Sequence, residues 1–213
     1  WRHPMTDATA VAAIAEQILL ARDRQTGLHV GRVGLLARLI AEDTAAHFGL
    51  AAAEVNQIGT FAPVHDLGKV GVSDAILLKP GRLSADERVQ VQLHVAGGLA
   101  LLNTLFTQCQ LHDPPSLIRD LVALHHERLD GSGYPNGLAG DAISPAGRII
   151  AVADVFDALT SARPYRRSSS AAEALQQLTA MVDQGELDPA CVQALRHRWD
   201  RVCAVVGCPP PAI

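Results

Sequence analysis

The chain has 213 residues, of which 48% are hydrophobic, and its formal net charge at pH 7 is −4. This length can bury one substantial core, and a slightly acidic chain without basic clusters argues against binding to a nucleic-acid polymer. Aromatic residues contribute 4%, so the core must consist of aliphatic side chains, which pack well between helices. The uninterrupted apolar runs are too short to span a bilayer and no secretory signal is present, so we expect a cytoplasmic chain without a membrane segment.

Apolar residues recur at the spacing of an α-helix along most of the chain. The first predicted helix, within residues 1–21, leads into the main domain and has an apolar face of Val11, Ile14 and Ile18. In the next helix, His29 shares a stripe with Val33. His29 therefore lies on the face that is expected to enter the core.

A third helix carries Ile58, Phe61 and His65 on one face. Pro63 interrupts it two residues before His65, and proline ends or bends a helix because it lacks a backbone N–H. We therefore expect His65 to lie just past a break in the helix, where main-chain carbonyls are free.

Two later segments complete the predicted bundle. A stripe of leucines from Leu117 to Leu124 runs directly into His125. Residues 148–159 are apolar on all sides except at Asp154 and Asp157. A helix that is hydrophobic all round is a buried one, so this segment predicts the centre of the bundle.

Loops are expected at residues 78–84, 112–116, 127–144 and 161–170, and Ser84, Ser144 and Ser170 are candidate helix N-caps. Strand signals are weak because the β-branched segments lack alternation and hairpin turns. We predict an all-α, single-domain helical bundle, with the main domain at residues 22–190 and a C-terminal helix and frayed tail at 191–213. The first residue is Trp rather than Met, so we expect a domain cut from a longer protein.

The four cysteines are Cys109, Cys191, Cys203 and Cys208. They contain no C-x-x-C pair and no zinc-type spacing with histidine. Disulfides are rare in cytoplasmic proteins, so we interpret all four as reduced thiols rather than as a disulfide framework.

Histidines and aspartates fall on the apolar stripes in five groups, made up of His29, His65, Asp66, His94, His125, His126 and Asp154. About thirty residues separate consecutive groups, which fits one helix away and one back, so every group can return to the same level of the bundle. Carboxylates are costly to bury unless they are paired with a cation, so we expect a metal site. Donors without thiolate favour Fe, Mn, Co, Ni or Zn, and seven ligands suit two ions that share one carboxylate.

Each of these residues also has a plain structural interpretation. A single histidine on an apolar face, such as His29, is more often a core residue with satisfied hydrogen bonds. Asp154 could cap a helix or pair with Arg148. We prefer the metal site because five separate stripes would each need an unrelated explanation. Asp157 is interpreted as structural, and the histidines that fit no stripe are expected at the surface: His3, His47, His112 and His197.

The segment VHDLGKVGV, residues 64–72, resembles the HD superfamily of metal-dependent phosphohydrolases. HHERLDGSGYPNGL, residues 125–138, is similar to the HD-GYP family within it, and QTGLHVGRV and VADVFDALTSARPYR appear in family order. The resemblance covers roughly residues 22–190 and implies an HD-type catalytic domain with two divalent ions, Fe or Mn, in a central cleft. It implies that one ion is held by His29, His65, Asp66 and Asp154, and that Asp66 bridges to a second held by His94, His125 and His126.

HD-GYP domains hydrolyse cyclic di-GMP, so the resemblance implies a bacterial second-messenger phosphodiesterase that yields linear pGpG, with GMP left open as a further product. It implies that Asp66 and Lys69 are catalytic, and that the substrate contacts are Lys69, Tyr134, Arg163 and Arg166. Some family members have a metal-binding Glu where this chain has Gln25, four residues before His29. The neutral amide of Gln25 predicts two metals rather than three.

Two other functions stay open. The domain could bind a cyclic dinucleotide or a signalling protein through the loop that carries Tyr134 while turning over slowly, although an intact ligand set argues against a dead enzyme. It could also act on mixed cyclic GMP-AMP, because the motifs say little about the second base. An upstream sensory or receiver domain in the parent chain is expected in either case.

Overall fold

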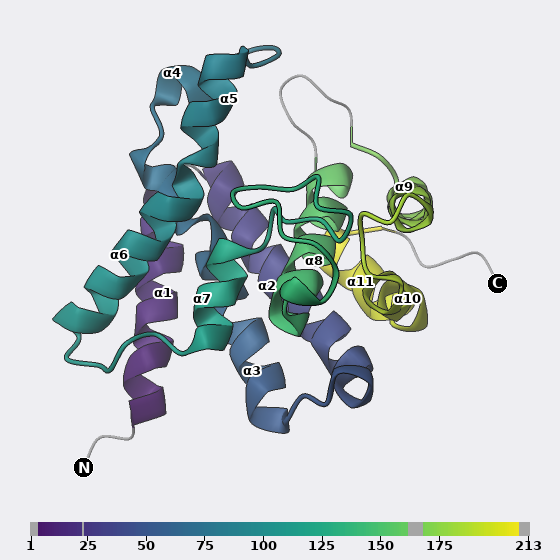
Figure 1. Ribbon diagram of the computed structural model, residues 1–213, viewed down its shortest axis with the longest axis horizontal. Helices are drawn as coiled ribbons and strands as arrows, with labels where there is room; N and C mark the ends of the chain where they lie inside the picture. Colours follow the sequence, from purple (N-terminus) through teal and green to yellow (C-terminus); the bar gives the residue numbers. More distant parts are fainter. Residues whose placement is uncertain (1–3, 23, 162–167, 209–213) are drawn as a thin grey trace.

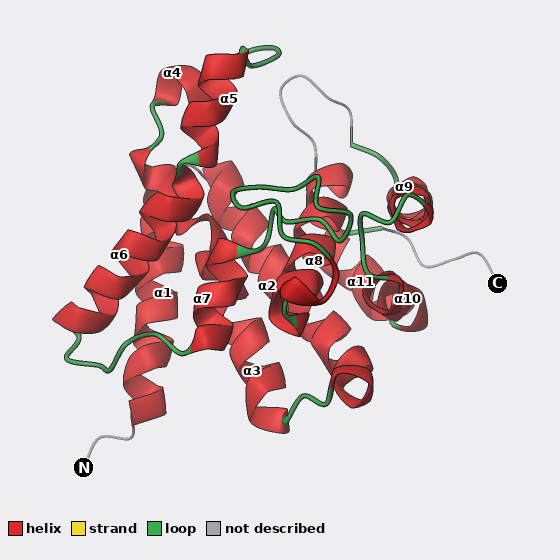
Figure 2. Ribbon diagram, viewed as in Figure 1, coloured by secondary structure: helices red, strands yellow, loops and turns green. Residues whose placement is uncertain are grey.

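The computed structural model describes residues 4–22, 24–161 and 168–208 (Figure 1). Within these ranges the chain is built of α-helices and two 3₁₀ segments (Figure 2), and its β-structure amounts to one isolated bridge between Asp130 and Ala139. The predicted all-α bundle is therefore confirmed.

The described residues form helical elements that follow one another along the chain. They are α1 (Pro4–Arg22), α2 (Arg24–Phe48), α3 (Ala52–Phe61), the 3₁₀ segment η1 (Ala62–Gly71), α4 (Asp74–Leu77), α5 (Ala85–Gln92), α6 (His94–Gln108), α7 (Ser116–Ala123), the 3₁₀ segment η2 (Gly140–Ala142), α8 (Pro145–Thr160), α9 (Ala171–Asp183), α10 (Pro189–His197) and α11 (Trp199–Val206). The region 191–213, expected to hold one helix, contains most of α10 and all of α11.

Helix α2 forms the middle of the bundle and packs against α1, α3, α8, α10 and α11. In Figure 1, α1, α6 and α7 lie on one side of the molecule, and α9, α10 and α11 gather on the other. The stripe predicted for α2 is buried at Val33, Leu36 and Ile40. Helix α8 buries residues on every side, as its apolar composition predicts.

The apolar face predicted for α1 is confirmed at Val11 and wrong at Ile14 and Ile18. Ile14 and Ile18 are 44% and 40% exposed, whereas Val11, Ala15 and Leu19 are buried. Most of α1 is apolar, so its sequence period does not single out one face. The buried face is formed by Val11, Ala12, Ala15 and Leu19.

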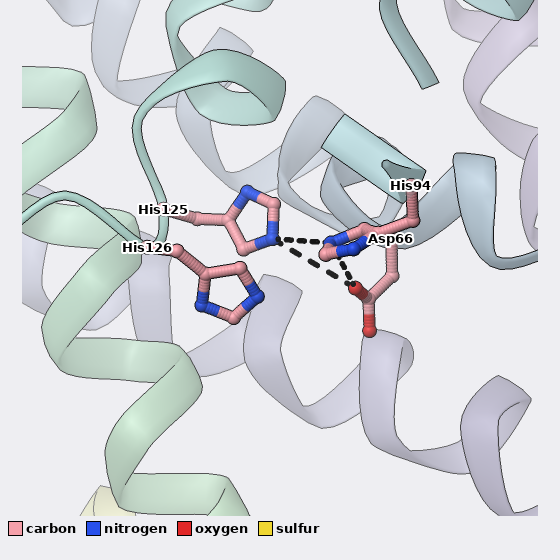
Figure 3. Close-up of side chains that lie close together, drawn as sticks. All are labelled: Asp66, His94, His125 and His126. Carbon is pink, nitrogen blue, oxygen red and sulfur yellow. Dashed lines mark hydrogen bonds and ion pairs between the residues drawn. The ribbon is translucent and has the colours of Figure 1, made fainter. Parts of the chain in front are cut away.

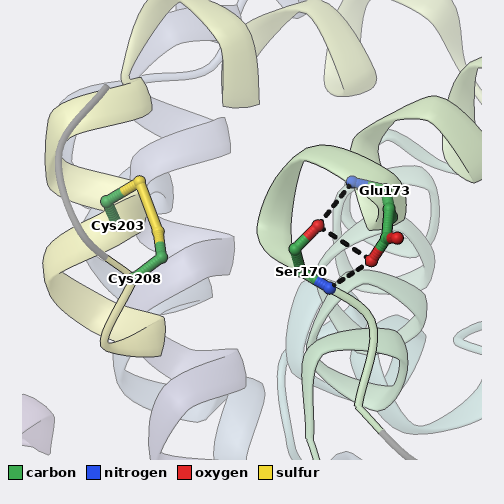
Figure 4. Close-up of a disulfide and its surroundings, with 4 residues drawn as sticks. All are labelled: Ser170, Glu173, Cys203 and Cys208. Carbon is green, nitrogen blue, oxygen red and sulfur yellow. Dashed lines mark hydrogen bonds between the residues drawn. A yellow bond between two sulfur atoms is a disulfide. The ribbon is translucent and has the colours of Figure 1, made fainter. Parts of the chain in front are cut away.

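The predicted helix boundaries hold where local chemistry determines them. Ser84, Ser144 and Ser170 each accept a hydrogen bond at the start of α5, α8 and α9, and Ser170 forms a capping box with Glu173 (Figure 4). Pro63 ends the α-helical course: α3 stops at Phe61 and the chain continues as η1.

The prediction of four reduced thiols is wrong for one pair, because Cys203 and Cys208 form a disulfide (Figure 4). The end of α11 explains it. Gly207 adopts the left-handed conformation, with φ of 74°, and the N–H groups of Gly207 and Cys208 both bond to the carbonyl of Cys203. This turn brings the two cysteine Cα atoms to 4.8 Å. Cys109 and Cys191 are free thiols.

Residues 85–108, which form α5 and α6, are long and apolar enough to cross a membrane by length and composition alone, which the sequence analysis did not anticipate. The core helices of soluble proteins pass the same test. Helix α6 buries His94, Leu102 and Phe106 against the rest of the protein, so packing accounts for part of its apolar character.

Candidate metal centre

The structure brings all seven predicted ligand residues to one place from five separate segments. His29 comes from α2, His65 and Asp66 from η1, His94 from the first turn of α6, His125 and His126 from the turn after α7, and Asp154 from α8. Six of the seven are buried and His126 is partly buried.

Asp66 joins two clusters of potential metal-binding atoms. Its carboxylate forms one cluster with His94, His125 and His126 (Figure 3) and another with His29 and His65, and within each cluster the donor atoms lie within 4.8 Å of one another. Asp66 Oδ1 lies 3.5 Å from His94 Nε2, while Oδ2 lies 3.4 Å from His65 Nε2. The two oxygens of one carboxylate thus face opposite halves of the centre.

Asp154 also lies between the two halves. Its Oδ1 is 3.2 Å from His29 Nε2, and its Oδ2 is 3.9 Å from His126 Nδ1. Arg148, which the sequence offered as an alternative partner for Asp154, instead bonds to Asp141 and Asp188. The pairing of Asp154 with Arg148 is therefore excluded.

Hydrogen bonds determine which ring nitrogen of each buried histidine faces inward. The Nδ1 atoms of His65, His94 and His125 lie 2.6–2.9 Å from the carbonyl oxygens of the residues three positions earlier. A carbonyl only accepts, so each Nδ1 carries the proton and donates it. The neutral rings therefore present an Nε2 lone pair to the centre.

The Nε2 lone pairs of neighbouring rings face one another with no hydrogen atom between them. The Nε2 atoms of His94 and His125 are 3.1 Å apart, a distance that suits a hydrogen bond, yet both protons lie on the opposite side of the rings. His65 Nε2 and Asp66 Oδ1 are buried without any hydrogen-bond partner. Converging acceptors of this kind fit a bound cation, and the imidazole and carboxylate set suits Fe, Mn or Zn.

Electrostatics keep the donors in their metal-binding forms. Burial lowers the pKa of His94 and His125, and it lowers that of His126 to about 3, so these rings are neutral at pH 7. Burial opposes ionisation of Asp66, but Lys69 and the neighbouring histidines outweigh it and hold its pKa well below the usual range.

His29 behaves differently in the absence of a cation. Burial lowers its pKa, but the carboxylates of Asp154, Asp157 and Asp66 outweigh that effect and raise the pKa to about 9. Its Nε2 points at Asp154 at 3.2 Å in ion-pair rather than hydrogen-bond geometry. At neutral pH the metal-free protein therefore holds a proton where a cation would bind.

The glycine after the His-Asp pair lets two of the segments meet. A Cβ atom on Gly68 would lie 1.8 Å from the carbonyl oxygen of His94, so only glycine allows η1 to contact the start of α6. This contact places Asp66 beside His94. The sequence motif is thus explained by backbone approach as well as by chemistry.

The loop after the paired histidines is fastened by Glu127, a residue that the sequence analysis left unassigned. Its buried carboxylate accepts N–H bonds from Asn136 at 2.8 Å and Leu138 at 2.9 Å. The loop places the ring of Tyr134 over that of His126, with centroids 4.5 Å apart. The available signal was a carboxylate directly between two candidate ligands and a glycine-rich loop.

Asp157, which was interpreted as structural, lies in contact with a candidate ligand. It is fully buried, and its Oδ2 lies 2.6 Å from His29 Nδ1. Its position one turn after Asp154 on an otherwise apolar helix was the signal in the sequence. Asp157 is thus the side-chain partner of His29 Nδ1.

The predicted substrate residues are only partly described. Lys69 Nζ lies 2.5 Å from Asp66 Oδ2, and the side chains of Lys69, His126 and Asp154 are 19%, 18% and 12% exposed, which marks the side of the centre that is open to solvent. Arg163 and Arg166 lie outside the described residues, as does His3. His47 and His112 are exposed as predicted, and the exposed His197 pairs with Asp43.

Comparison with known proteins agrees with this arrangement. The HD domain family matches residues 10–191. The chain is 43% identical over 190 residues to a cyclic di-GMP phosphodiesterase response regulator from Xanthomonas campestris, covering 85% of this chain and 46% of that protein. It is 40% identical over 185 residues to a 3'3'-cGAMP-specific phosphodiesterase from Vibrio cholerae, covering 87% of this chain and 34% of that protein.

The chain thus spans about a third to a half of the length of these relatives. A solved structure of an HDG"Y"P protein from Bdellovibrio bacteriovorus has a similar fold, with a TM-score of 0.58, 19% sequence identity and coverage of 79% of this chain and 51% of that one. Together with the motifs, the family match shows that this chain belongs to the HD domain family, in its HD-GYP branch.

Proposed function

We propose that this domain is a metal-dependent phosphodiesterase that hydrolyses cyclic di-GMP to linear pGpG, with GMP left open as a further product, in bacterial second-messenger signalling. The observation that carries the proposal is the pair of donor clusters that share Asp66. Relatives named as cyclic di-GMP phosphodiesterases match most of the chain, including one from Thermotoga maritima at 39% identity over 175 residues.

The proposed site holds two divalent ions, Fe or Mn. His29, His65, Asp66 and Asp154 would hold one, and Asp66, His94, His125 and His126 the other. Such ions stabilise charge on the phosphoryl group in the transition state and activate water for attack on phosphorus. The chain contributes a carboxylate common to both halves and rings whose Nε2 atoms already face inward.

Lys69 is proposed to contact the substrate phosphate. Its ammonium pairs with Asp66 Oδ2 in the metal-free protein and lies at the solvent-open side of the centre. With cations bound beside Asp66, Lys69 would be able to donate to a non-bridging phosphate oxygen. Tyr134, stacked on His126, and Arg163 and Arg166 are the other proposed substrate contacts.

Mixed cyclic GMP-AMP is the second candidate substrate. The specific observation is that a relative named for that substrate is 40% identical, close to the 43% of the cyclic di-GMP relative. A domain that binds cyclic dinucleotides with little turnover is less well supported, because all seven donors are present and converge.

The surroundings of the domain are also part of the proposal. Because the chain spans at most half of its curated relatives, we propose that residues 22–190 act as the catalytic domain of a larger cytoplasmic protein with an upstream sensory or receiver domain. The loop from Glu127 to Ser144 is the proposed contact for a signalling partner.

The test is turnover by protein purified without oxygen and loaded with Fe(II) or Mn(II). Cyclic di-GMP and 3'3'-cGAMP would be supplied separately, and chromatography would identify linear dinucleotides and mononucleotides. We expect metal-dependent loss of at least one substrate. If protein with two ions per chain cleaves neither, the phosphodiesterase proposal is wrong.

A further inference from the structure

The carboxylate of Asp157 lies behind the candidate metal centre and has more partners than a core residue needs. His29 Nδ1 is 2.6 Å from Oδ2, and Arg32 donates through Nε to Oδ1 at 2.5 Å and through Nη2 to Oδ2 at 3.0 Å. Ser161 Oγ donates to Oδ2 at 3.0 Å and accepts from Arg32 at 2.7 Å. The buried carboxylate of Asp157 thus has three side-chain partners: Arg32, Ser161 and the candidate ligand His29.

His29 needs such a partner because of where it lies. The other three anchored rings, His65, His94 and His125, lie in or beside the ends of helical segments, and each donates its Nδ1 proton to the carbonyl three residues earlier. His29 lies within the 25-residue helix α2, where the carbonyls accept main-chain N–H groups. The Nδ1 atom of His29 instead meets a side-chain acceptor from another helix, the carboxylate of Asp157.

Arg32 is what keeps Asp157 in place. It belongs to the same helix as His29, almost one turn later, and its planar guanidinium contacts both oxygens of Asp157. An unpaired buried carboxylate would be strongly destabilising. The pair therefore presents a charge-balanced, rotationally fixed acceptor to His29.

We propose that Asp157, fixed by Arg32, is a positioning residue that sets the proton position and ring orientation of His29 and thereby governs metal occupancy in one half of the centre. That half is formed by His29, His65 and Asp66. The half formed by His94, His125 and His126 does not depend on Asp157, because carbonyls hold two of its rings. The inference rests on the metal centre of the proposed function but not on which dinucleotide is cleaved.

The test is the Mn(II) content of the full chain with Asp157→Asn. Asparagine keeps the size of the side chain, but its NH₂ group must face a donor of either Arg32 or His29. Loss of a carboxylate behind a metal-binding histidine weakens metal affinity about 10–100-fold. We expect one tightly bound Mn(II) per chain in place of two, measured by elemental analysis after dialysis against a fixed free Mn(II) concentration.

Electron paramagnetic resonance gives a readout that a general loss of stability would not produce. Two neighbouring Mn(II) ions give an exchange-coupled signal, whereas a single ion gives an isolated six-line spectrum. We expect the coupled signal in the wild type and the isolated one in Asp157→Asn at limiting Mn(II). A higher Mn(II) concentration should restore the coupled signal.

Asp188→Asn is the matched control. Asp188 is another buried aspartate paired with an arginine, Arg148, near the opposite end of α8, and asparagine preserves its N-cap role for α10. This variant should keep both ions. Arg32→Lys retains the positive charge but loses the planar guanidinium that contacts both oxygens of Asp157. It should weaken binding of the same ion as Asp157→Asn, and it replaces that variant in the test if Asp157→Asn does not fold.

The proposal is overturned if Asp157→Asn or Arg32→Lys binds both ions with wild-type affinity. It is also overturned if both ions weaken equally, or if Asp188→Asn loses the same ion. Absence of dinucleotide hydrolysis in the wild type would refute the proposed function and leave this metal count unaffected.

Discussion

Metal binding to the two halves of the centre should depend differently on pH. In the metal-free protein the pKa of His29 is raised to about 9, because the carboxylates of Asp154 and Asp157 outweigh its burial. A cation must displace that proton. The pKa values of His94, His125 and His126 are lowered by burial, so these rings have no proton to lose above pH 6.5.

The size of the effect follows from the His29 pKa. Below that value, each pH unit changes the protonated-to-neutral ratio tenfold, so affinity in the His29 half should rise about 100-fold between pH 6.5 and 8.5. Affinity in the His94 half should stay flat over that range. Calorimetric Mn(II) titrations without oxygen, in buffers of different ionisation enthalpy, would measure both affinities and the proton released.

The same shift predicts how the metal-free fold responds to pH. The folded pKa of about 9 lies above the ordinary value of 6.5, so the stabilisation from the His29 proton is complete below pH 6.5 and is lost as the pH rises through 9. The difference between these two pKa values of His29 corresponds to about 3 kcal/mol in the free energy of unfolding. Equal pH dependence in both halves, or no proton release at pH 7.5, would refute the reasoning.

Four further predictions follow from the same centre. Asp66→Ala should abolish turnover and lower the metal count, because one carboxylate serves both halves; elemental analysis and an activity assay check this, and a fully active variant would contradict the shared-carboxylate site. Lys69→Ala should reduce turnover by about tenfold or more while leaving both ions bound, since a charge-assisted contact contributes about 1.5–3 kcal/mol; a parallel loss of metal would show that Lys69 serves the metal instead. Glu127→Gln should lower the free energy of unfolding by about 1–3 kcal/mol, because one loop N–H loses its acceptor, and it should raise KM, because Tyr134 loses its support. Urea unfolding and steady-state kinetics measure the two effects, and an unchanged urea midpoint would argue against the idea that Glu127 holds the loop in place. Wild-type crystals soaked in Mn(II) should show two ions by anomalous scattering, and Gln25→Glu should add a third, because a carboxylate offsets charge that an amide does not; three full sites in the wild type would falsify the count.

Local chemistry made much of this protein readable from its sequence. Helix starts depend on a side chain and an N–H group three residues away, so Ser84, Ser144 and Ser170 could be identified as caps. Pro63 lies inside a helical pattern of apolar residues, where proline ends or bends the helix. A histidine or aspartate on an apolar stripe indicates a site that supplies it with a partner, because burying such a side chain without one costs free energy.

Side-chain partners far apart in the sequence were decided only by the tertiary structure. Of the two aspartates on one apolar helix, the sequence singled out Asp154 for the centre. It did not show that Asp157 contacts His29, which is 128 residues away. The inward face of α1 and the role of Glu127 depend in the same way on what packs against them.

The disulfide is a short-range case in which the sequence supplies the groups and the tertiary structure decides whether they pair. Cys203 and Cys208 are five residues apart, too far for one regular helical turn to align them. The two cysteines meet because α11 ends at Val206 and Gly207, in the left-handed conformation, turns the chain back toward the helix. A sequence specifies which groups must find partners, because the cost of burying them is a local property. Which partner each group finds depends on how the helices are rotated against one another, and that is determined by packing over the whole chain.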